Sequence, residues 1–169
     1  MSTCTLVYLV RDGQVCLGFK KRGFGAGWWN GFGGKVRAGE DVRAAAVREL
    51  QEECGVRAAL EALADAGALR FTFLAEAGKT IHVRIFRVAQ FDGEPIETEE
   101  MRPQWFTPDT LPYDEMWSDD RVWMPRFLNG ERVRGWFQFD ANNQHVAYEL
   151  EDTKEVVRAA SSTGRAPGS

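Results

Sequence analysis

Histidine and cysteine are scarce in this sequence, and their scarcity argues against several kinds of catalytic site. Only two histidines, His82 and His145, occur among 169 residues, which gives little support to a His-rich zinc site or a Ser-His-Asp hydrolase. Both are instead expected to lie in strands. The three cysteines form an odd set without CxxC spacing. The sequence also shows no charged-then-apolar leader pattern. This and the unpaired set of cysteines predict a reduced, cytoplasmic location.

Long apolar runs, basic clusters and internal repeats are also lacking. No run is long enough to cross a membrane, and the 21 lysines and arginines are spread along the chain. Because the formal net charge is −4, we expect no membrane association and no stable binding to nucleic acid. Neither the Walker phosphate-binding pattern nor the GxGxxG pattern occurs, so a P-loop or a Rossmann site is not expected.

Length and composition fit one compact domain. The 169 residues are 44% hydrophobic and 27% charged, which is enough to bury a sizeable core. We expect a single domain over residues 1–155 that acts as a monomer. A disordered tail is expected over residues 156–169, because its last nine residues carry no side chain that could build a core.

The most informative stretch of the chain runs from Gly34 to Val56. Residues 41–54 are mostly good helix formers, with Asp41 suited to the N-cap and Gly55 to a left-handed stop. Side chains three and four positions apart share a helical face, so Glu49, Glu52 and Glu53 are expected to project together. Val42, Ala46 and Leu50 form another stripe that is expected to pack inward.

The shared acidic face has two interpretations. Three crowded carboxylates repel one another unless a cation lies among them, and oxygen-only ligation favours magnesium or manganese over zinc. The alternative is a solvated acidic face, which many surface helices carry. The glycine-rich approach at residues 31–35 favours the metal site, because glycines let backbone groups come close to a metal or a phosphate.

Short β-rich runs surround this helix. The first two are joined by Asp12-Gly13, a hairpin signal, and a later pair is joined by a turn at residues 76–78, so each pair should be antiparallel. A second helix is expected over residues 118–128, with Ser118 or Asp119 as its cap. The expected strands cover residues 5–10, 14–19, 69–74, 80–88, 132–139 and 145–150. This alternation predicts a layered α/β sandwich.

The spacing within residues 34–56 reads Gx5Ex7REUxEExGU, where U is aliphatic, so the chain resembles the Nudix hydrolases. Residues 18–35, 100–103 and 116–120 are similar to the 8-oxo-dGTP diphosphatases of the MutT-homologue branch, and the similarity covers roughly residues 3–150. The resemblance implies the α/β Nudix fold, an α-β-α sandwich around a mixed β-sheet. Trp28 departs from that branch, which has a cation there, and Cys54 replaces a small polar residue.

The resemblance also implies a purine pocket. Asn30, Asp119 and Asp120 would address the base edges, Trp117 would stack on the ring, and other residues would line the walls or lie near the sugar and phosphates. The residues expected to contact the nucleotide are Thr5, Lys20, Phe24, Asn30, Gly34, Lys35, Met101, Trp117, Asp119 and Asp120.

Several of these residues have an ordinary structural alternative. Trp117 could be a core aromatic, as is expected for Trp123. Asp119 and Asp120 could be first-turn acids that favour a helix N-terminus, and Asn30 could be a turn residue.

The chemistry expected is metal-assisted hydrolysis of oxidised purine nucleoside triphosphates, such as 8-oxo-dGTP and 2-oxo-dATP, to monophosphate and pyrophosphate. Arg48 would orient the glutamates, and spacing does not decide which glutamate takes the proton from water. The expected ligands of Mg²⁺, with Mn²⁺ as an alternative, are Gly33, Glu49, Glu52, Glu53 and Glu100. Two alternatives are a Nudix hydrolase of a dinucleoside polyphosphate or sugar nucleotide, and a non-catalytic nucleotide-sensing module.

Overall fold

The structure is a computed structural model, and it describes residues 2–152. The tail expected at residues 156–169 lies outside the described residues, as does the end of the expected domain at residues 153–155. Within the described part, no helix is both long and apolar enough to cross a membrane.

One mixed sheet organises the described residues, in the order β3-β2-β1-β5-β4-β7-β8, with β6 paired to β2. The pairs β1–β5 and β4–β7 are parallel, and the other pairs are antiparallel. The strands are β1 (Ser2–Arg11), β2 (Gln14–Lys20), β3 (Trp29–Asn30), β4 (Leu63–Phe73), β5 (Lys79–Val88), β6 (Met101–Phe106), β7 (Val133–Phe139) and β8 (His145–Leu150). The helices are α1 (Val42–Cys54) and α2 (Asp120–Leu128), with short 3₁₀ turns at residues 60–62, 74–76, 108–110 and 113–115.

Both predicted hairpins are present. Asp12 and Gly13 have positive φ angles of 52° and 75°, which suits the tight turn that joins β1 to β2. The antiparallel pairing of β4 with β5 is also confirmed, but β4 begins at Leu63 rather than at residue 69. A bulge at Asp65 and Gly67 interrupts the alternation of side chains there. The early part of β4 therefore lacks the sequence pattern of a strand.

Two strands were not predicted. β6 contains Pro103, which argues against a strand, yet β6 pairs only with β2 and so lies at an edge where a missing N–H is tolerated. β3 is only two residues long and has no periodicity to detect.

The first helix forms as predicted. The Asp41 side chain accepts a hydrogen bond from the Ala44 N–H over 3.1 Å, and Gly55 ends the helix at φ 77°. Ala46 and Leu50 are fully buried in a cluster with Phe86 of β5. α1 therefore covers one face of the sheet.

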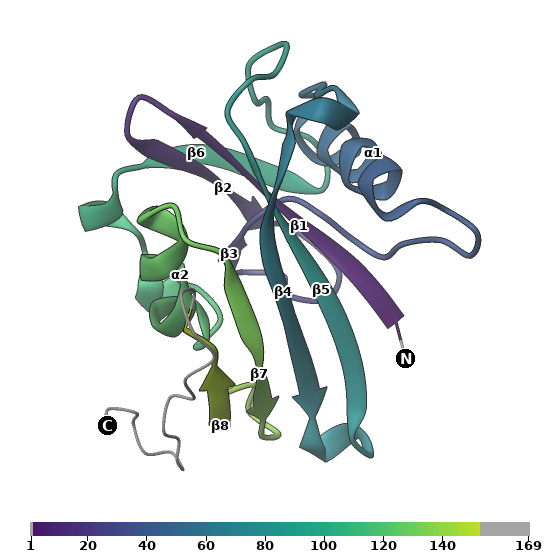
Figure 1. Cartoon of the computed structure of the whole chain (residues 1–169), viewed down its shortest axis with the longest axis vertical. Helices are drawn as coiled ribbons and strands as arrows, with labels where there is room; N and C mark the ends of the chain where they lie inside the picture. Colours follow the sequence, from purple (N-terminus) through teal and green to yellow (C-terminus); the bar gives the residue numbers. More distant parts are fainter. Residues whose placement is uncertain (1, 153–169) are drawn as a thin grey trace.

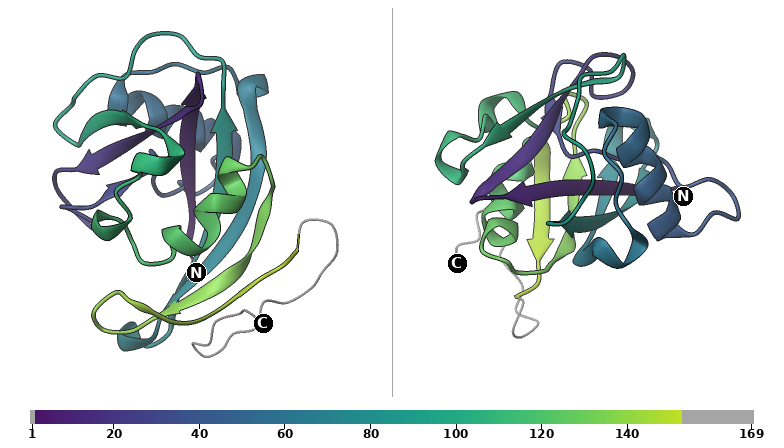
Figure 2. Two further views of the ribbon diagram at one scale, coloured as in Figure 1. Left: turned by 90° about the vertical axis from the view of Figure 1, so that its left-hand side faces the viewer. Right: turned by 90° about the horizontal axis from the view of Figure 1, so that it is seen from above.

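The second helix covers the opposite face. Trp123 and Phe127 of α2 are fully buried and both contact the ring of Tyr8 in β1. Figures 1 and 2 show the sheet between α1 and α2, which confirms the α-β-α sandwich. Asp119, one of the two residues predicted as the cap of α2, is its N-cap, but its side chain makes no capping hydrogen bond. Asp119 has helical backbone angles, and its carboxyl group is directed elsewhere.

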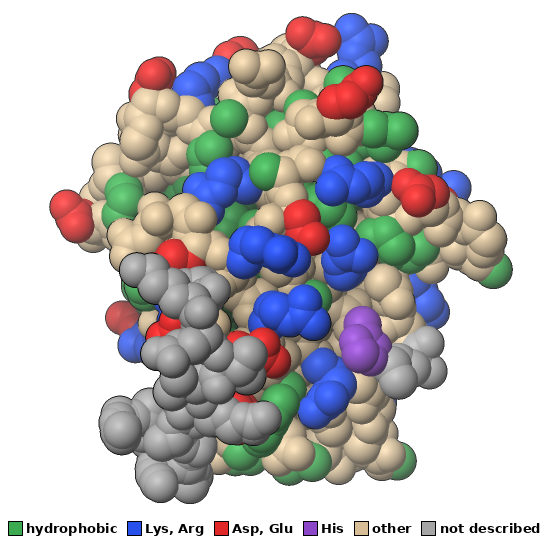
Figure 3. All heavy atoms as spheres, viewed as in Figure 1, with side chains coloured by type: hydrophobic (Ala, Val, Ile, Leu, Met, Phe, Trp, Pro, Cys, Tyr) green, Lys and Arg blue, Asp and Glu red, His purple; other side chains and the backbone are tan. Residues whose placement is uncertain are grey.

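Arginines that are scattered in the sequence gather on one face when the strands pair (Figure 3). Arg84 of β5 and Arg132, beside β7, both lie near Asp65 Oδ2, at 3.6 Å and 3.1 Å. Arg134 of β7 lies 3.8 Å from Glu151. Acids on the same face thus balance part of its charge.

Candidate active site

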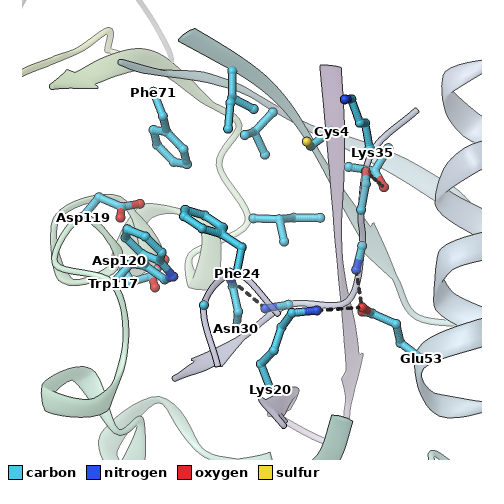
Figure 4. Close-up of a pocket in the computed structure, with 18 of the residues that line it drawn as sticks. Cys4, Lys20, Phe24, Asn30, Lys35, Glu53, Phe71, Trp117, Asp119 and Asp120 are labelled. Carbon is cyan, nitrogen blue, oxygen red and sulfur yellow. Dashed lines mark hydrogen bonds and ion pairs between the residues drawn. The ribbon is translucent and has the colours of Figure 1, made fainter. Parts of the chain in front are cut away.

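A pocket of about 320 Å³ opens beside the first half of β1, on the side of the sheet that carries α2. Its walls come from β1, β2, β4, β5, the glycine-rich loop at residues 31–35, the end of α1 and the turn before α2. The glycine-rich loop reaches the pocket because it pairs with β1, through bonds from the Thr5 N–H to the Gly34 carbonyl and from the Val7 N–H to the Phe32 carbonyl. Figure 4 shows carboxylates at both ends of this pocket.

One end of the pocket is walled by aromatic rings. The Trp117 ring lies 5.3 Å from the Phe24 ring at an angle of 36°, and Phe73 contacts both rings edge-on. Phe24 is 63% exposed, so one side of this wall is open to solvent. Such a slot fits a flat, partly polar ring system.

Two adjacent carboxyl groups are buried beside the aromatic wall. Asp119 and Asp120 both line the pocket and are almost inaccessible to solvent. Asp119 Oδ2 accepts a hydrogen bond from Trp123 Nε1 over 2.8 Å, whereas Asp120 Oδ2 has no hydrogen-bond partner among the described residues. Burial raises the pKa of Asp119 to about 6, and the Trp123 bond opposes the rise. Burial, and then the neighbouring Asp119, raise the pKa of Asp120 well above its ordinary value.

Asn30 enters the same end of the pocket from β3. Its side-chain oxygen accepts hydrogen bonds from the Gly31 N–H over 2.8 Å and from the Tyr8 hydroxyl over 3.3 Å. With the oxygen held in this way, the amide nitrogen is the group that can donate to a ligand (Figure 4). The aromatic end therefore offers a donor, Asn30, beside two carboxyl groups.

Glu53 lies at the other end of the pocket. Its side chain is 6% exposed, Oε1 accepts from the Gly33 N–H over 2.9 Å, and Oε2 lies 3.8 Å from Lys20 Nζ. Burial raises the pKa of Glu53 to about 7, while the Gly33 N–H and Lys20 act in the opposite direction. Gly33 itself cannot carry a side chain, because a Cβ atom there would lie 1.8 Å from the Thr5 carbonyl oxygen.

Arg48 organises the remaining carboxylates of α1. It donates to both Glu40 oxygens, over 2.8 Å and 3.0 Å, and its Nη1 lies 3.0 Å from Glu49 and 3.3 Å from Glu52. Arg48 Nη2 also donates to the Lys35 carbonyl over 3.2 Å, which ties the helix to the glycine-rich loop. The Arg48 guanidinium lowers the pKa of Glu40 to about 2. This geometry agrees with the orienting role expected for Arg48 and the supporting role expected for Glu40.

The chemistry of the donor set fits a hard divalent cation. Glu49, Glu52, Glu53 and Glu100 offer only oxygen atoms, and Gly34 allows Glu49 to approach the loop, since a Cβ there would lie 2.5 Å from the Glu49 carboxylate. Within residues 2–152, however, no three such groups already converge on one point. The carboxylates form ion pairs with two basic side chains instead: Arg48 contacts Glu49 and Glu52, and Lys20 contacts Glu53 and Glu100.

The structure brings most of the predicted site residues together. Those that line the pocket are Thr5, Lys20, Phe24, Asn30, Gly33, Gly34, Lys35, Glu53, Met101, Trp117, Asp119 and Asp120. Glu49, Glu52, Glu100 and Arg48 lie outside its lining, next to the Glu53 end. Trp123 is fully buried, as predicted.

Sequence reasoning missed the apolar floor. Phe71 and Phe73 of β4 and Ile81 and Val83 of β5 line the pocket, as does Leu6 of β1. Each pair of strand residues is two positions apart, and this period-2 pattern was the available signal. It gives the shared face but does not say which ligand that face meets.

Comparison with known proteins places the chain in a family. A family model for the NUDIX domain matches residues 3–127. The oxidized purine nucleoside triphosphate hydrolase of Danio rerio is 45% identical over 152 residues, which cover 90% of this chain and 96% of that protein. The protein of the same name from Mus musculus is 42% identical, over 88% of this chain and 93% of that protein.

A solved structure shares the fold. The crystal structure of a MutT protein from Bacillus halodurans superposes with a TM-score of 0.78 at 25% sequence identity, covering 89% of this chain and 98% of that one. The topology described above is thus found in an experimentally determined protein.

Proposed function

The chain belongs to the Nudix family, and we propose that it hydrolyses oxidised purine nucleoside triphosphates, such as 8-oxo-dGTP and 2-oxo-dATP, to monophosphate and pyrophosphate. One observation carries the choice of substrate: two adjacent carboxyl groups are buried at the aromatic end of a pocket whose other end holds Glu53. Two family relatives that are more than 40% identical are named as hydrolases of oxidised purine nucleoside triphosphates.

The aromatic end selects the base. Trp117 stacks on the purine ring, while Asn30 donates to one edge of the base. Asp119 and Asp120 share a proton at another edge, so that one accepts and the other donates. An oxidised purine presents both donors and acceptors, and a site built to bond such groups rejects bases that leave its polar atoms unpaired.

The opposite end holds the phosphates. Lys35 and the loop at Gly34 would contact them, and Thr5 and Lys20 would lie near the sugar. Glu49, Glu52, Glu53, Glu100 and the Gly33 carbonyl would hold Mg²⁺, or Mn²⁺ in its place. When bound, the ion neutralises charge on the phosphates and lowers the pKa of a bound water. Arg48 orients Glu49 and Glu52, and one of the glutamates takes the proton from the attacking water.

The direct test is a substrate panel with magnesium, scored by kcat/KM. We expect 8-oxo-dGTP and 2-oxo-dATP to exceed dGTP and dATP, with pyrophosphate and the nucleoside monophosphate as the first products. Orthophosphate with a nucleoside diphosphate would contradict the proposed position of attack. Faster turnover of a dinucleoside polyphosphate or a sugar nucleotide would reassign the substrate. If none of these compounds were hydrolysed, the alternative of a non-catalytic nucleotide-sensing module would be favoured. Action as a monomer, in the cytoplasm and without nucleic acid, stays a prediction from the sequence.

A further inference from the structure

Ser118 stands between two residues of the base end, yet it is not among the residues that line the pocket. Trp117 and Asp119 line the pocket on either side of it. The Ser118 Oγ atom lies 2.8 Å from His145 Nδ1 and accepts the backbone N–H of His145 over 3.0 Å. The turn before α2 is thus attached to the start of β8, which is 27 residues away in the sequence.

The Ser118 hydroxyl group acts as a hydrogen-bond donor and as an acceptor at the same time. Burial, and then Arg121, lower the pKa of His145, so its ring is neutral at pH 7 and Nδ1 can accept the Ser118 O–H. The same oxygen satisfies the His145 N–H, at a point where the register of β7 and β8 shifts between Gln138 and Phe139. A backbone donor at such an irregularity needs a partner outside the ladder of the sheet.

The histidine ring is itself held in place by aromatic contacts. It lies edge-on to Phe137 at 5.6 Å and to Tyr148 at 5.7 Å. Phe139, which is paired with His145 across the hairpin, makes an edge contact with Trp117 at 5.8 Å. The end of the β7–β8 hairpin therefore backs the aromatic wall of the pocket.

The turn has a second attachment on its other side. Met116 forms an isolated bridge with Trp29, next to Asn30 in β3. The two attachments, at Met116 and Ser118, flank Trp117, and Asp119 and Asp120 follow Ser118 directly in the chain.

We propose that Ser118 and His145 are positioning residues for base selection: their reciprocal hydrogen bonds fix the turn that carries Trp117, Asp119 and Asp120. This role rests on the proposed function, because it concerns how the same pocket recognises a purine. Neither residue touches the base. The groups at the phosphate end, Glu53 and Gly33, come from α1 and the glycine-rich loop and do not depend on this pair.

The separation of the two ends predicts which kinetic constant changes. Loosening the turn weakens contacts to the base in the ground state and in the transition state alike, so KM rises while kcat is kept. It also lowers selectivity, because discrimination between oxidised and normal purines requires buried donors and acceptors at set positions. A pair that served stability alone would lower the melting temperature and leave selectivity unchanged.

Four variants test this role through steady-state kinetics on 8-oxo-dGTP and dGTP. In Ser118→Ala and in His145→Phe, which keeps a ring but removes the acceptor, KM for 8-oxo-dGTP should rise about three- to tenfold with kcat within twofold. The preference over dGTP should fall by a similar factor. His145→Asn keeps an acceptor near the position of Nδ1. It should therefore keep KM and the preference over dGTP closer to wild type than His145→Phe does. Val146→Ala, at a neighbouring residue that is 43% exposed, is the matched control and should behave as wild type.

Hydrogen exchange of the nucleotide-free protein gives a readout that does not depend on the substrate. Amides at residues 116–121 should exchange faster in Ser118→Ala than in Val146→Ala, while the peptide covering residues 45–54 of α1 stays unchanged. Wild-type KM, selectivity and exchange in both Ser118→Ala and His145→Phe would overturn the positioning role. If wild-type protein hydrolysed neither nucleotide, the proposed function would fail, and the exchange data alone would decide whether the pair holds the turn.

Discussion

The indole N–H of Trp123 donates to Asp119 over 2.8 Å, and this bond makes the two carboxyl groups at the base end unequal. It stabilises the charged form of Asp119 and opposes the rise in its pKa. Asp120 Oδ2 has no such partner within the described residues, and the charge of Asp119 raises the pKa of Asp120 further. At neutral pH the pair therefore carries its shared proton on Asp120, with Asp119 as the acceptor.

The unequal pair predicts a change of selectivity in Asp119→Asn. An amide has a fixed donor and a fixed acceptor, so the pair could no longer move a proton to suit a different base edge. We expect the ratio of kcat/KM between 8-oxo-dGTP and 2-oxo-dATP to change about tenfold, as the loss of one bond to a charged group implies. The pH dependence of KM between about pH 6 and 9 should change as well.

The neighbouring acid Asp114 provides the control for this experiment. Its side chain is 97% exposed and pairs with Arg121 on the surface, so Asp114→Asn should keep both the ratio and the pH profile. Asp120→Ala should weaken both oxidised substrates, because the base acceptor that meets the Asp120 proton is left unpaired. Unchanged selectivity and pH profiles in Asp119→Asn and Asp120→Ala together would show that these aspartates do not read the base.

Asp119 also predicts how folding stability varies with pH. Its pKa of about 6 in the folded protein lies above the ordinary value of 3.8, so between about pH 4 and 6 the folded state binds more protons than the unfolded state. Stability contributed by the protonated form is complete below pH 4 and is lost as the pH rises through 6. In urea titrations, Asp119→Asn should lose less stability than wild type over this interval, by about 1–2 kcal/mol. An identical slope for the two proteins would contradict the raised pKa.

The parts of this structure that the sequence predicts are those set by neighbouring residues. α1 is predicted at both ends because its cap, Asp41, and its stop, Gly55, act within a turn of the helix. The sequence also predicts that the glutamates of α1 share one helical face, but it does not predict how deeply each side chain is buried. Glu53 is buried and accepts a hydrogen bond from the Gly33 N–H, whereas the Glu52 side chain is 51% exposed.

The features that were missed depend on pairing between distant strands. Phe71 of β4 and Ile81 of β5 are partners in the predicted hairpin, but they line the pocket beside Leu6 only because β5 also pairs with β1, across about 80 residues of chain. Ser118 was one of two candidate caps for α2, and Asp119 holds that position. The hydrogen bond of Ser118 to a distant residue was missed for the same reason. Its partner, His145, lies in a strand that no local pattern connects to the turn.

The buried position of Glu53 predicts a large catalytic effect for Glu53→Gln. The change is isosteric but removes the charge that would hold a cation against the phosphates, so kcat should fall at least about a hundredfold, corresponding to roughly 3 kcal/mol. The ratio of KM values for oxidised and normal purines should stay the same, because the base end is untouched. Glu61→Gln, an exposed acid just after α1, is the control and should keep wild-type kcat. Near-wild-type turnover of Glu53→Gln at saturating magnesium would show that Glu53 is not a metal ligand.

The position of Lys20 predicts that its ammonium group competes with a divalent metal ion for Glu53 and Glu100. Its Nζ atom lies 3.8 Å from Glu53 Oε2 and 3.8 Å from Glu100 Oε1, between two of the proposed metal ligands. A unit charge about 4 Å away is worth about 1 to 4 kcal/mol for effective dielectric constants from 80 to 20. Removing that charge in Lys20→Met should therefore strengthen Mn²⁺ binding to the nucleotide-free protein, by about tenfold.

The adjacent residue makes this experiment a matched comparison. Lys21 contacts Glu97 and the Thr98 carbonyl instead, so Lys21→Met removes the same charge one residue away without touching Glu53 or Glu100. The signal of free Mn²⁺ in electron paramagnetic resonance measures both affinities directly. We expect tighter binding in Lys20→Met alone, because only there does the ion lose a competitor. Equal affinities in the two variants would mean that Lys20 does not compete with the ion for these carboxylates. Loss of binding in Lys20→Met would instead mean that Lys20 helps to build the metal site.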